Sequence, residues 1–431
     1  MLLETRKSLA MSAFTPLLQR QNTMWLCIFY VMSFSFAEEI TGVDQLIHLA
    51  QNSFLIQSID AQIEQENRAR DSISWQDPNI KGSIAPLTIA SNDASMNSVG
   101  MVVGIRQVLP LYDILDTKRA MQEYVIDIIE VSKKKQQLQL QENILVEYGR
   151  WCQMQEMLLA NRSHQAILEQ QQQYIDTQRV SDNKAQLWSV SVQRVVQERK
   201  ATEAMYVSQI RQIEQGWLRW IQNPVTGSES YGYFSTLQIQ DLASLPHVPM
   251  RSVEIEMLDR QRDMVQQNLE LRSIEQKPQV AWNAQYNNLM MSPTGFWTVG
   301  VDVTPSISRS SDDAEIAKIQ FTLQSIEAQR QQMEQDIISQ RLVLEERWNL
   351  VNTQLALLEK QQALLNEESL VLYQLLRTST GMYTELLNIG HKQIAVDEQI
   401  ASVKNERWSI LGRWYTLHGY IVVKQATEGG I

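Results

Sequence analysis

The chain has 431 residues, with 38 Lys and Arg against 49 Asp and Glu, so its formal net charge is −11 at pH 7. An acidic chain without a basic stripe argues against nucleic acid as a partner. No stretch contains the ~18–20 consecutive apolar residues that a membrane-spanning helix requires. If the protein crosses a membrane, it must therefore do so with strands.

The N-terminus, residues 1–37, reads as a secretory signal peptide. Arg6, Lys7 and Arg20 precede a short apolar run at residues 25–36, which ends in small residues. A basic segment, a short apolar segment and a small-residue cleavage site are typical of exported proteins. The alternative is a membrane-anchor helix, for which this apolar run is short.

The next stretch predicts a helix and then two strands. Helical periodicity covers residues 43–75, with a candidate interruption at 52–53. Residues 98–107 instead alternate apolar with small or polar side chains, which predicts a strand. Residues 81–90 are a weaker strand candidate, and residues 91–93 form the turn between the two strands.

A long helix is predicted at residues 116–177. An apolar or small residue recurs every seven positions, as expected for a helix that packs along a partner helix: Val131, Leu138, Leu145, Cys152, Leu159 and Ala166. At this spacing Cys152 is expected to be a small core residue rather than a reactive thiol. A second helix returns over residues 187–221 and ends before Pro224.

The same order of elements then recurs. Residues 253–274 are helical, residues 280–287 and 297–303 alternate as strands, and a long helix and a returning helix follow. The long helix has a heptad series in which one member alone is not apolar: Ile316, Leu323, Arg330, Ile337, Leu344, Val351, Leu358, Leu365 and Leu372. Such a helix would be roughly 90–100 Å long.

The sequence thus predicts a mainly α protein with a small β part, built from two structural repeats offset by about 195 residues, as from Pro110 to Pro305. The expected organisation is a signal peptide, a first repeat, a linker rich in Pro and Gly, a second repeat and a C-terminal tail, at residues 1–37, 38–222, 223–249, 250–419 and 420–431.

The strands predict a membrane β-barrel shared between protomers. One face of the strands is apolar and aromatic, as lipid-facing positions require; its members are Val99, Met101, Val103, Ile105, Trp282, Tyr286, Trp297, Val299 and Val301. Four strands are too few to close a barrel, so several protomers would each contribute four. The alternative is a soluble four-stranded sheet with one face on a core.

This arrangement resembles the TolC-like outer-membrane efflux family. The segment that leads from strand to helix in that family is similar to Val103-Gly104-Ile105-Arg106-Gln107-Val108-Leu109-Pro110-Leu111-Tyr112. Leu49-Ala50-Gln51-Asn52 resembles the family's first helix, and residues 373–388 resemble its last helical tip. The likeness covers nearly all of residues 43–419. It implies a homotrimer in the outer membrane, with a twelve-stranded barrel and a long helical tunnel in the periplasm.

The resemblance also implies a function and its residues. The protein would be a passive exit duct of an efflux or type I secretion system, in contact with a periplasmic adaptor protein and an inner-membrane pump. The pore constriction would lie at Glu385 and Asn388, where only Glu385 supplies charge. The tips that meet the adaptor would be Gln178, Arg179, Val180, Ser181 and Asp182, and Thr378, Ser379, Thr380 and Gly381.

No catalytic constellation is visible, and we expect neither an enzyme nor a cofactor or metal site. The histidines are scattered without metal-ligand spacing. The adjacent Met290 and Met291 are the strongest alternative, as thioether ligands for copper(I). The alternative for the whole protein is a periplasmic coiled-coil adaptor or scaffold, which has no reason to carry duplicated strands with lipid-type faces.

Overall fold

A computed structural model describes residues 42–74, 79–91, 94–109, 113–178, 183–220, 234, 237–240, 243–248, 250–289, 295–304, 310–376 and 383–422. The predicted signal peptide lies outside these residues. Within the described ranges, no helix combines the length and the apolarity that a membrane span needs.

The predicted order of elements is confirmed. The first repeat consists of α3 (Val43–Gln51), α4 (Phe54–Asp71), β1 (Asn79–Ser91), β2 (Ala94–Leu109), α5 (Ile114–Gln178) and α6 (Asn183–Trp217). The second consists of α8 (Val253–Glu275), β3 (Gln279–Leu289), β4 (Gly295–Thr304), α9 (Ser310–Leu376) and α10 (Tyr383–His418). The candidate interruption of the first helix is the gap between α3 and α4.

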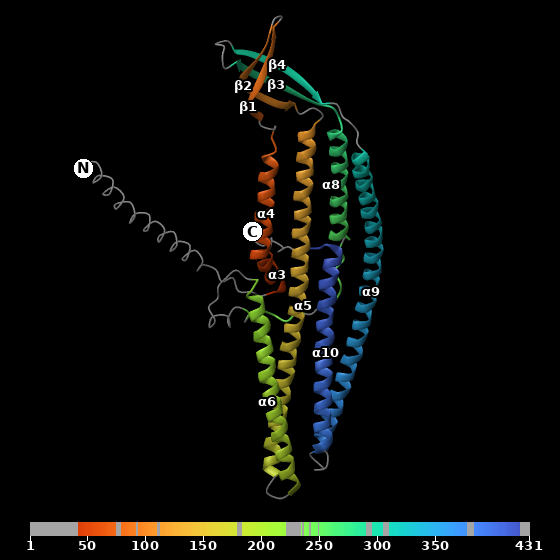
Figure 1. Cartoon of the computed structure of the whole chain (residues 1–431). Coiled ribbons are helices and arrows are strands. Elements are labelled where there is room, and N and C mark those ends of the chain that lie inside the picture. Colours follow the sequence, from red (N-terminus) through yellow and green to blue (C-terminus); the bar gives the residue numbers. More distant parts are fainter. Residues whose placement is uncertain are drawn as a thin grey trace, which may run out of the picture.

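The helices form one elongated wall with the sheet at its end (Figure 1). The helices α5 and α9 run along the wall, and at 1.5 Å per residue each is about 100 Å long. In the half near the sheet, the neighbours in order are α4, α5, α8 and α9. In the other half they are α6, α5, α10 and α9. Shorter helices thus follow one another end to end beside the two long ones.

The largest core lies where α3, α5, α6 and α10 meet. Trp217 is fully buried and packs edge-on against Phe234, with ring centroids 5.2 Å apart. The hydroxyl of Tyr148 donates to the carbonyl oxygen of Gln238 at 2.6 Å and accepts from the amide of Gln240 at 3.1 Å. These bonds attach the segment after α6 to the middle of the wall.

The heptad series of α9 is largely confirmed. Ile337, Leu344, Val351 and Leu365 are buried, and the remaining apolar members are half-buried. Arg330, the polar member, donates through Nε to Oδ1 of Asp259 on α8 at 2.9 Å, so an ion pair takes the place of an apolar contact there.

For α5, the prediction that the heptad series packs against a partner helix is wrong beyond Cys152. Its first four members are buried, but Leu159 is 56% exposed and Ala166 is exposed. Leu158 and Leu168 are buried instead. An α-helix has 3.6 rather than 3.5 residues per turn, so a straight helix rotates a seven-residue series away from its partner by about 20° per heptad.

The strands form one antiparallel sheet in the order β1-β2-β3-β4. The two halves of the chain meet where β2 pairs with β3, with Val103 opposite Tyr286. The two hairpins of the repeats therefore share one sheet, whose edge strands are β1 and β4.

Candidate functional site

The sheet presents one continuous apolar face. The register places Tyr286 opposite both Val103 and Trp297, and the exposed fractions of Trp297, Val299 and Val301 are 67%, 75% and 67%. The same face contains the other predicted lipid-facing residues with described side chains, Met101, Ile105 and Trp282. Val99 continues the alternation of β2, but its side chain lies outside the described part. Contact of this face with lipid stays a prediction.

No described helix covers this apolar face, because the sheet lies beyond the helix ends (Figure 1). Packing of the face on a core of the same chain is therefore excluded for the described residues. An exposed apolar surface of this kind marks contact with another protein or a membrane.

The opposite face of the sheet is polar and internally hydrogen-bonded. Asn283 donates through Nδ2 to Oδ1 of Asp302 at 2.9 Å, and Nε of Arg106 lies 3.4 Å from Oδ2 of Asp302. Asn287 donates through Nδ2 to the hydroxyl of Thr298 at 2.8 Å. The two faces thus differ as the outside and the lumen of a barrel differ.

Along the wall, glycines allow α5 and α10 to approach closely. A Cβ on Gly149 would lie 2.6 Å from Cβ of Trp408, and one on Gly412 would lie 3.2 Å from the carbonyl oxygen of Glu142. Sequence reasoning missed both residues, because a glycine within a helical pattern does not reveal which neighbour it faces. They fix the spacing between the two repeats.

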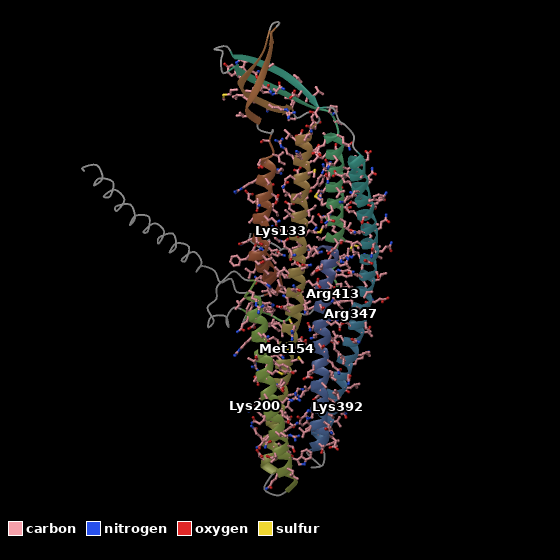
Figure 2. All side chains as sticks on the ribbon, in the orientation of Figure 1. Lys133, Met154, Lys200, Arg347, Lys392 and Arg413 are labelled. Atoms are coloured by element: carbon pink, nitrogen blue, oxygen red, sulfur yellow. The ribbon has the colours of Figure 1, made fainter. Side chains whose placement is uncertain are left out.

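Ion pairs join neighbouring helices along the same wall. The side chains of Lys133 and Arg347, both labelled in Figure 2, pair with Asp60 on α4 and with Glu406 on α10. The Arg347 pair has an Nε–Oε1 distance of 2.7 Å. Partly exposed pairs of this kind typically stabilise by less than about 1 kcal/mol each, so they set register more than stability.

One long edge of the wall is apolar and is not covered by any other part of the chain that the structure describes. The outer side of α9 carries a second heptad series that is 55–65% exposed, at Val343, Leu350, Leu357, Leu364 and Val371. Sequence reasoning missed it although its signal is legible: each member immediately precedes a member of the buried series. Two adjacent apolar residues per heptad indicate contacts in two directions.

The opposite edge of the wall also exposes apolar side chains. Phe54 on α4 is 70% exposed, and Leu187 and Val190 on α6 are 73% and 60% exposed. The two edges therefore both retain surface that contact with another chain would remove from water.

At the end distant from the sheet, the structure describes part of the predicted site. Glu385 and Asn388 lie exposed on the first turns of α10, while Leu386 and Ile389 beside them are buried. Gln178 is the last residue of α5. The remaining predicted tip residues, Arg179, Val180, Ser181, Asp182, Thr378, Ser379, Thr380 and Gly381, lie outside the described residues.

Two half-buried carboxyls and one buried thiol lie in the middle of the wall. Trp151 donates through Nε1 to Oε1 of Glu214 at 3.1 Å, and burial raises the pKa of the Glu214 and Glu147 carboxyls. Cys152 is buried, which confirms the expected core role, and this burial raises the pKa of its thiol to about 11. Within the described part, no three or more His, Cys, Asp or Glu residues are placed to hold a metal ion. Met290 and Met291 lie outside that part.

Solved outer-membrane channels share this fold. The CusC structure, from work on folding and transmembrane channel formation, has 14% identity and a TM-score of 0.68 over 88% of this chain and 92% of that chain. The MtrE outer membrane channel of Neisseria gonorrhoeae, in its open state, has 13% identity and a TM-score of 0.67 over 89% and 90%. The outer membrane protein VceC of Vibrio cholerae has 10% identity and a TM-score of 0.65 over 88% and 96%.

No protein-family sequence profile and no curated protein matches the chain. At these low identities the structural likeness establishes the fold. The expected resemblance to the TolC-like channels is therefore confirmed at the level of architecture: mostly helical, with two repeats and one small sheet.

Proposed function

We propose that the protein is a passive exit duct of the outer membrane, which continues through the periplasm as a helical tube. The observation that carries this proposal is the sheet with an exposed apolar face and a hydrogen-bonded polar face, placed at the end of a wall about 100 Å long. A membrane barrel needs both faces, and a soluble scaffold needs neither.

The duct would be a homotrimer closed head to tail. An open sheet edge is not tolerated in lipid, so the edge strand β4 must pair with β1 of a neighbour. Because the four strands alternate in direction, that pairing is antiparallel. Three copies would give the twelve strands expected from the resemblance.

The arrangement of the helices supports the same head-to-tail trimer as the pairing of the edge strands. Helix α9 follows β4 and forms one edge of the wall, and α4 precedes β1 at the other edge. A single rotation therefore brings the exposed heptad series of α9 against the exposed side chains of α4 and α6 in the next copy. Head-to-tail contacts of this kind close into a ring when the rotation between copies is a whole fraction of a turn, which for three copies is one third.

The end distant from the sheet would meet the periplasmic partners. The predicted tips, at residues 178–182 and 378–381, would contact an adaptor protein, through which an inner-membrane pump supplies the energy. In the trimer, three copies of Glu385 would form an acidic ring near the axis and favour cations at that mouth. Asn388 adds no charge to the ring.

Two arginine substitutions, one on each face of the sheet, test the proposal. Val301→Arg would place a charge in lipid, at a cost of roughly 2–4 kcal/mol near the bilayer centre. We expect loss of the heat-stable trimer from outer-membrane extracts, measured by semi-native electrophoresis. Gln285→Arg is the matched control, because Gln285 is exposed on the polar face. Equal trimer yields from the two variants, or a soluble periplasmic monomer for the wild type, would contradict the proposal.

A further inference from the structure

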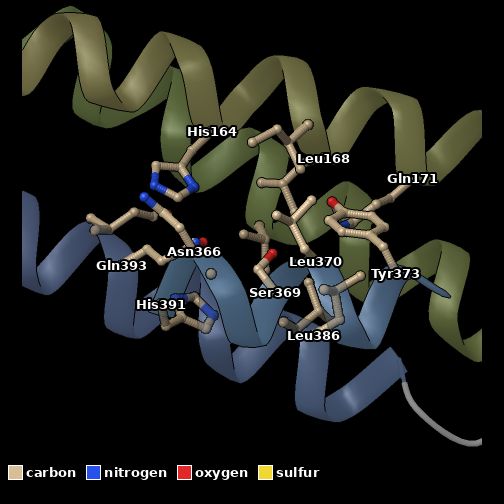
Figure 3. A pocket seen from close by; sticks show the side chains of 15 residues that line it. His164, Leu168, Gln171, Asn366, Ser369, Leu370, Tyr373, Leu386, His391 and Gln393 are labelled. Atoms are coloured by element: carbon tan, nitrogen blue, oxygen red, sulfur yellow. Dashed lines mark hydrogen bonds between the residues drawn. The ribbon is translucent and has the colours of Figure 1, made fainter. Parts of the chain in front are cut away.

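A cavity lies between the two helical hairpins, near the end distant from the sheet (Figure 3). Its volume is about 350 Å³. Its lining comes from four helices of one chain: α5 and α6 on one side, α9 and α10 on the other. The site is therefore complete in a single protomer and does not depend on the proposed assembly.

The lining contains no Lys, Arg, Asp or Glu, although 20% of the chain is charged. Leu168, Leu386 and Ile394 form buried apolar walls. An ionised ligand would give up hydration on entering the cavity and would find no Lys, Arg, Asp or Glu of opposite charge among the lining residues, which disfavours its binding. The cavity therefore favours an uncharged occupant.

Among the polar side chains of the lining, two are already hydrogen-bonded, Gln171 and Gln393, and two are not bonded to any described residue, Ser369 and His391. Gln171 donates to the hydroxyl of Tyr373 at 2.8 Å, and Gln393 donates to Asn366 at 2.9 Å. The Ser369 hydroxyl and the His391 ring, both labelled in Figure 3, form no hydrogen bond with the part of the chain that the structure describes. Together they supply donors and acceptors for a hydroxyl or carbonyl group of a ligand.

Gly390 keeps the cavity open. Glycine within a helix is less favourable than alanine, because it loses more conformational freedom on folding. Gly149 and Gly412 are explained by close helix contacts, but a Cβ on Gly390 would meet nothing within 4 Å. The same glycine lines the cavity, so a side chain at this position would enter the empty space. A helix-weakening residue without a packing reason is consistent with space retained for a ligand.

We propose that this cavity binds an uncharged, amphiphilic small molecule with an aromatic or branched aliphatic body and at least one hydroxyl or carbonyl group. The volume falls within the range of roughly 300–1,000 Å³ that is typical of small-molecule sites. Such a ligand would touch both hairpins at once. Because it would bind the present spacing of the hairpins, it would stabilise that spacing, and more so as the ligand concentration rises above its dissociation constant.

Photolabelling with 4-(hydroxymethyl)benzophenone tests this proposal, because the probe is neutral, aromatic and carries one hydroxyl group. The full-length protein is labelled in lipid nanodiscs, and the labelled peptides are identified by mass spectrometry. We expect saturable labelling of the α9 and α10 segments that line the cavity. Labelling that does not saturate, or that is confined to the apolar face of the sheet, would overturn the proposal.

Gly390→Leu fills the cavity and is expected to lower this labelling at least tenfold. Ala395→Leu is the matched control: Ala395 is exposed on the same helix and does not line the cavity, so labelling should stay at the wild-type level. Ser369→Leu narrows the cavity from α9 and replaces Gly390→Leu if that variant fails to fold. Unchanged labelling of a folded cavity-filling variant refutes the site.

Charged analogues test the preference for uncharged ligands. The 4-benzoylbenzoate anion and the 4-(aminomethyl)benzophenone cation have nearly the same size as the neutral probe. We expect each to label the cavity at least tenfold more weakly. Labelling by either ion as strong as that by the neutral probe would overturn the assigned ligand class.

Discussion

The close approach of α5 and α10 at Gly149 predicts that replacement of glycine by alanine has opposite effects on stability at Gly149 and at Gly390. Replacement of glycine by alanine inside a helix stabilises by about 1 kcal/mol when the added methyl group meets no obstacle. Gly390 meets this condition, since its Cβ would find no atom within 4 Å. Gly149 does not, because its Cβ would lie 2.6 Å from Cβ of Trp408 and 2.7 Å from Oδ1 of Asn405.

The size of the effect follows from which atoms obstruct the methyl group. The Cβ of Trp408 is fixed to the backbone of α10, and the Trp408 side chain is buried, so the two helices must separate by several tenths of an ångström. Overpacking of this kind costs about 1–3 kcal/mol. We therefore expect Gly149→Ala to lower the free energy of unfolding by up to about 2 kcal/mol after the gain in helix propensity is subtracted.

The assay is thermal unfolding of the purified protein in detergent, followed by far-ultraviolet circular dichroism. Gly390→Ala should raise the unfolding midpoint and Gly149→Ala should lower it. Gly412→Ala should give an intermediate value, because its Cβ would lie 3.2 Å from the carbonyl oxygen of Glu142. An unfolding midpoint for Gly149→Ala equal to or above that of Gly390→Ala would refute the close contact between α5 and α10 at Gly149.

Three further predictions concern charge and reactivity. Arg330→Gln should lower the unfolding midpoint slightly in low salt and have no effect in 1 M NaCl, because it removes a solvent-accessible ion pair with Asp259. Cys152 should resist iodoacetamide at pH 8 in the folded protein, since it is buried and burial raises its pKa to about 11; mass spectrometry would follow the alkylation. Burial raises the pKa of Glu147 and Glu214 above the ordinary 4.5, so their contribution to stability is full below that pH and is lost as pH rises through their folded pKa values. Unfolding midpoints measured across this pH range should show the loss, and Glu147→Gln with Glu214→Gln should flatten it.

Each of these predictions has a contradicting result. An effect of Arg330→Gln that persists in 1 M NaCl would show that packing, and not charge, holds this position. Rapid alkylation of Cys152 in the folded protein would contradict its place in the core. A pH dependence that is unchanged in the double glutamate variant would assign the effect to other groups.

Periodicity in the sequence predicted the elements because it depends only on local geometry. The seven-residue series of α9 and the two-residue alternation around Val103 and Val301 each follow from the repeat of one backbone conformation. The turn at Asn52 and Ser53 and the breakers after Trp217 were likewise legible. The order of elements, their duplication and the apolar face of the sheet are therefore confirmed by the structure.

Prediction failed where a contact depends on the position of another helix. Leu159 continues the heptad of α5 in the sequence but faces solvent, because α5 rotates relative to its partners. The sequence did not distinguish Gly149, which a tryptophan covers, from Gly390, which borders empty space.

The sequence by itself determined that long helices and amphipathic strands recur twice, because side-chain periodicity is a property of each element alone. Tertiary structure decided what those elements build: which strands share a sheet, which edges stay uncovered and where a cavity remains. These outcomes depend on distances between residues far apart in the chain, such as 248 positions between Glu156 and Lys404, whose side chains meet at 2.9 Å. No local pattern encodes such distances, since they arise only when whole helices pack.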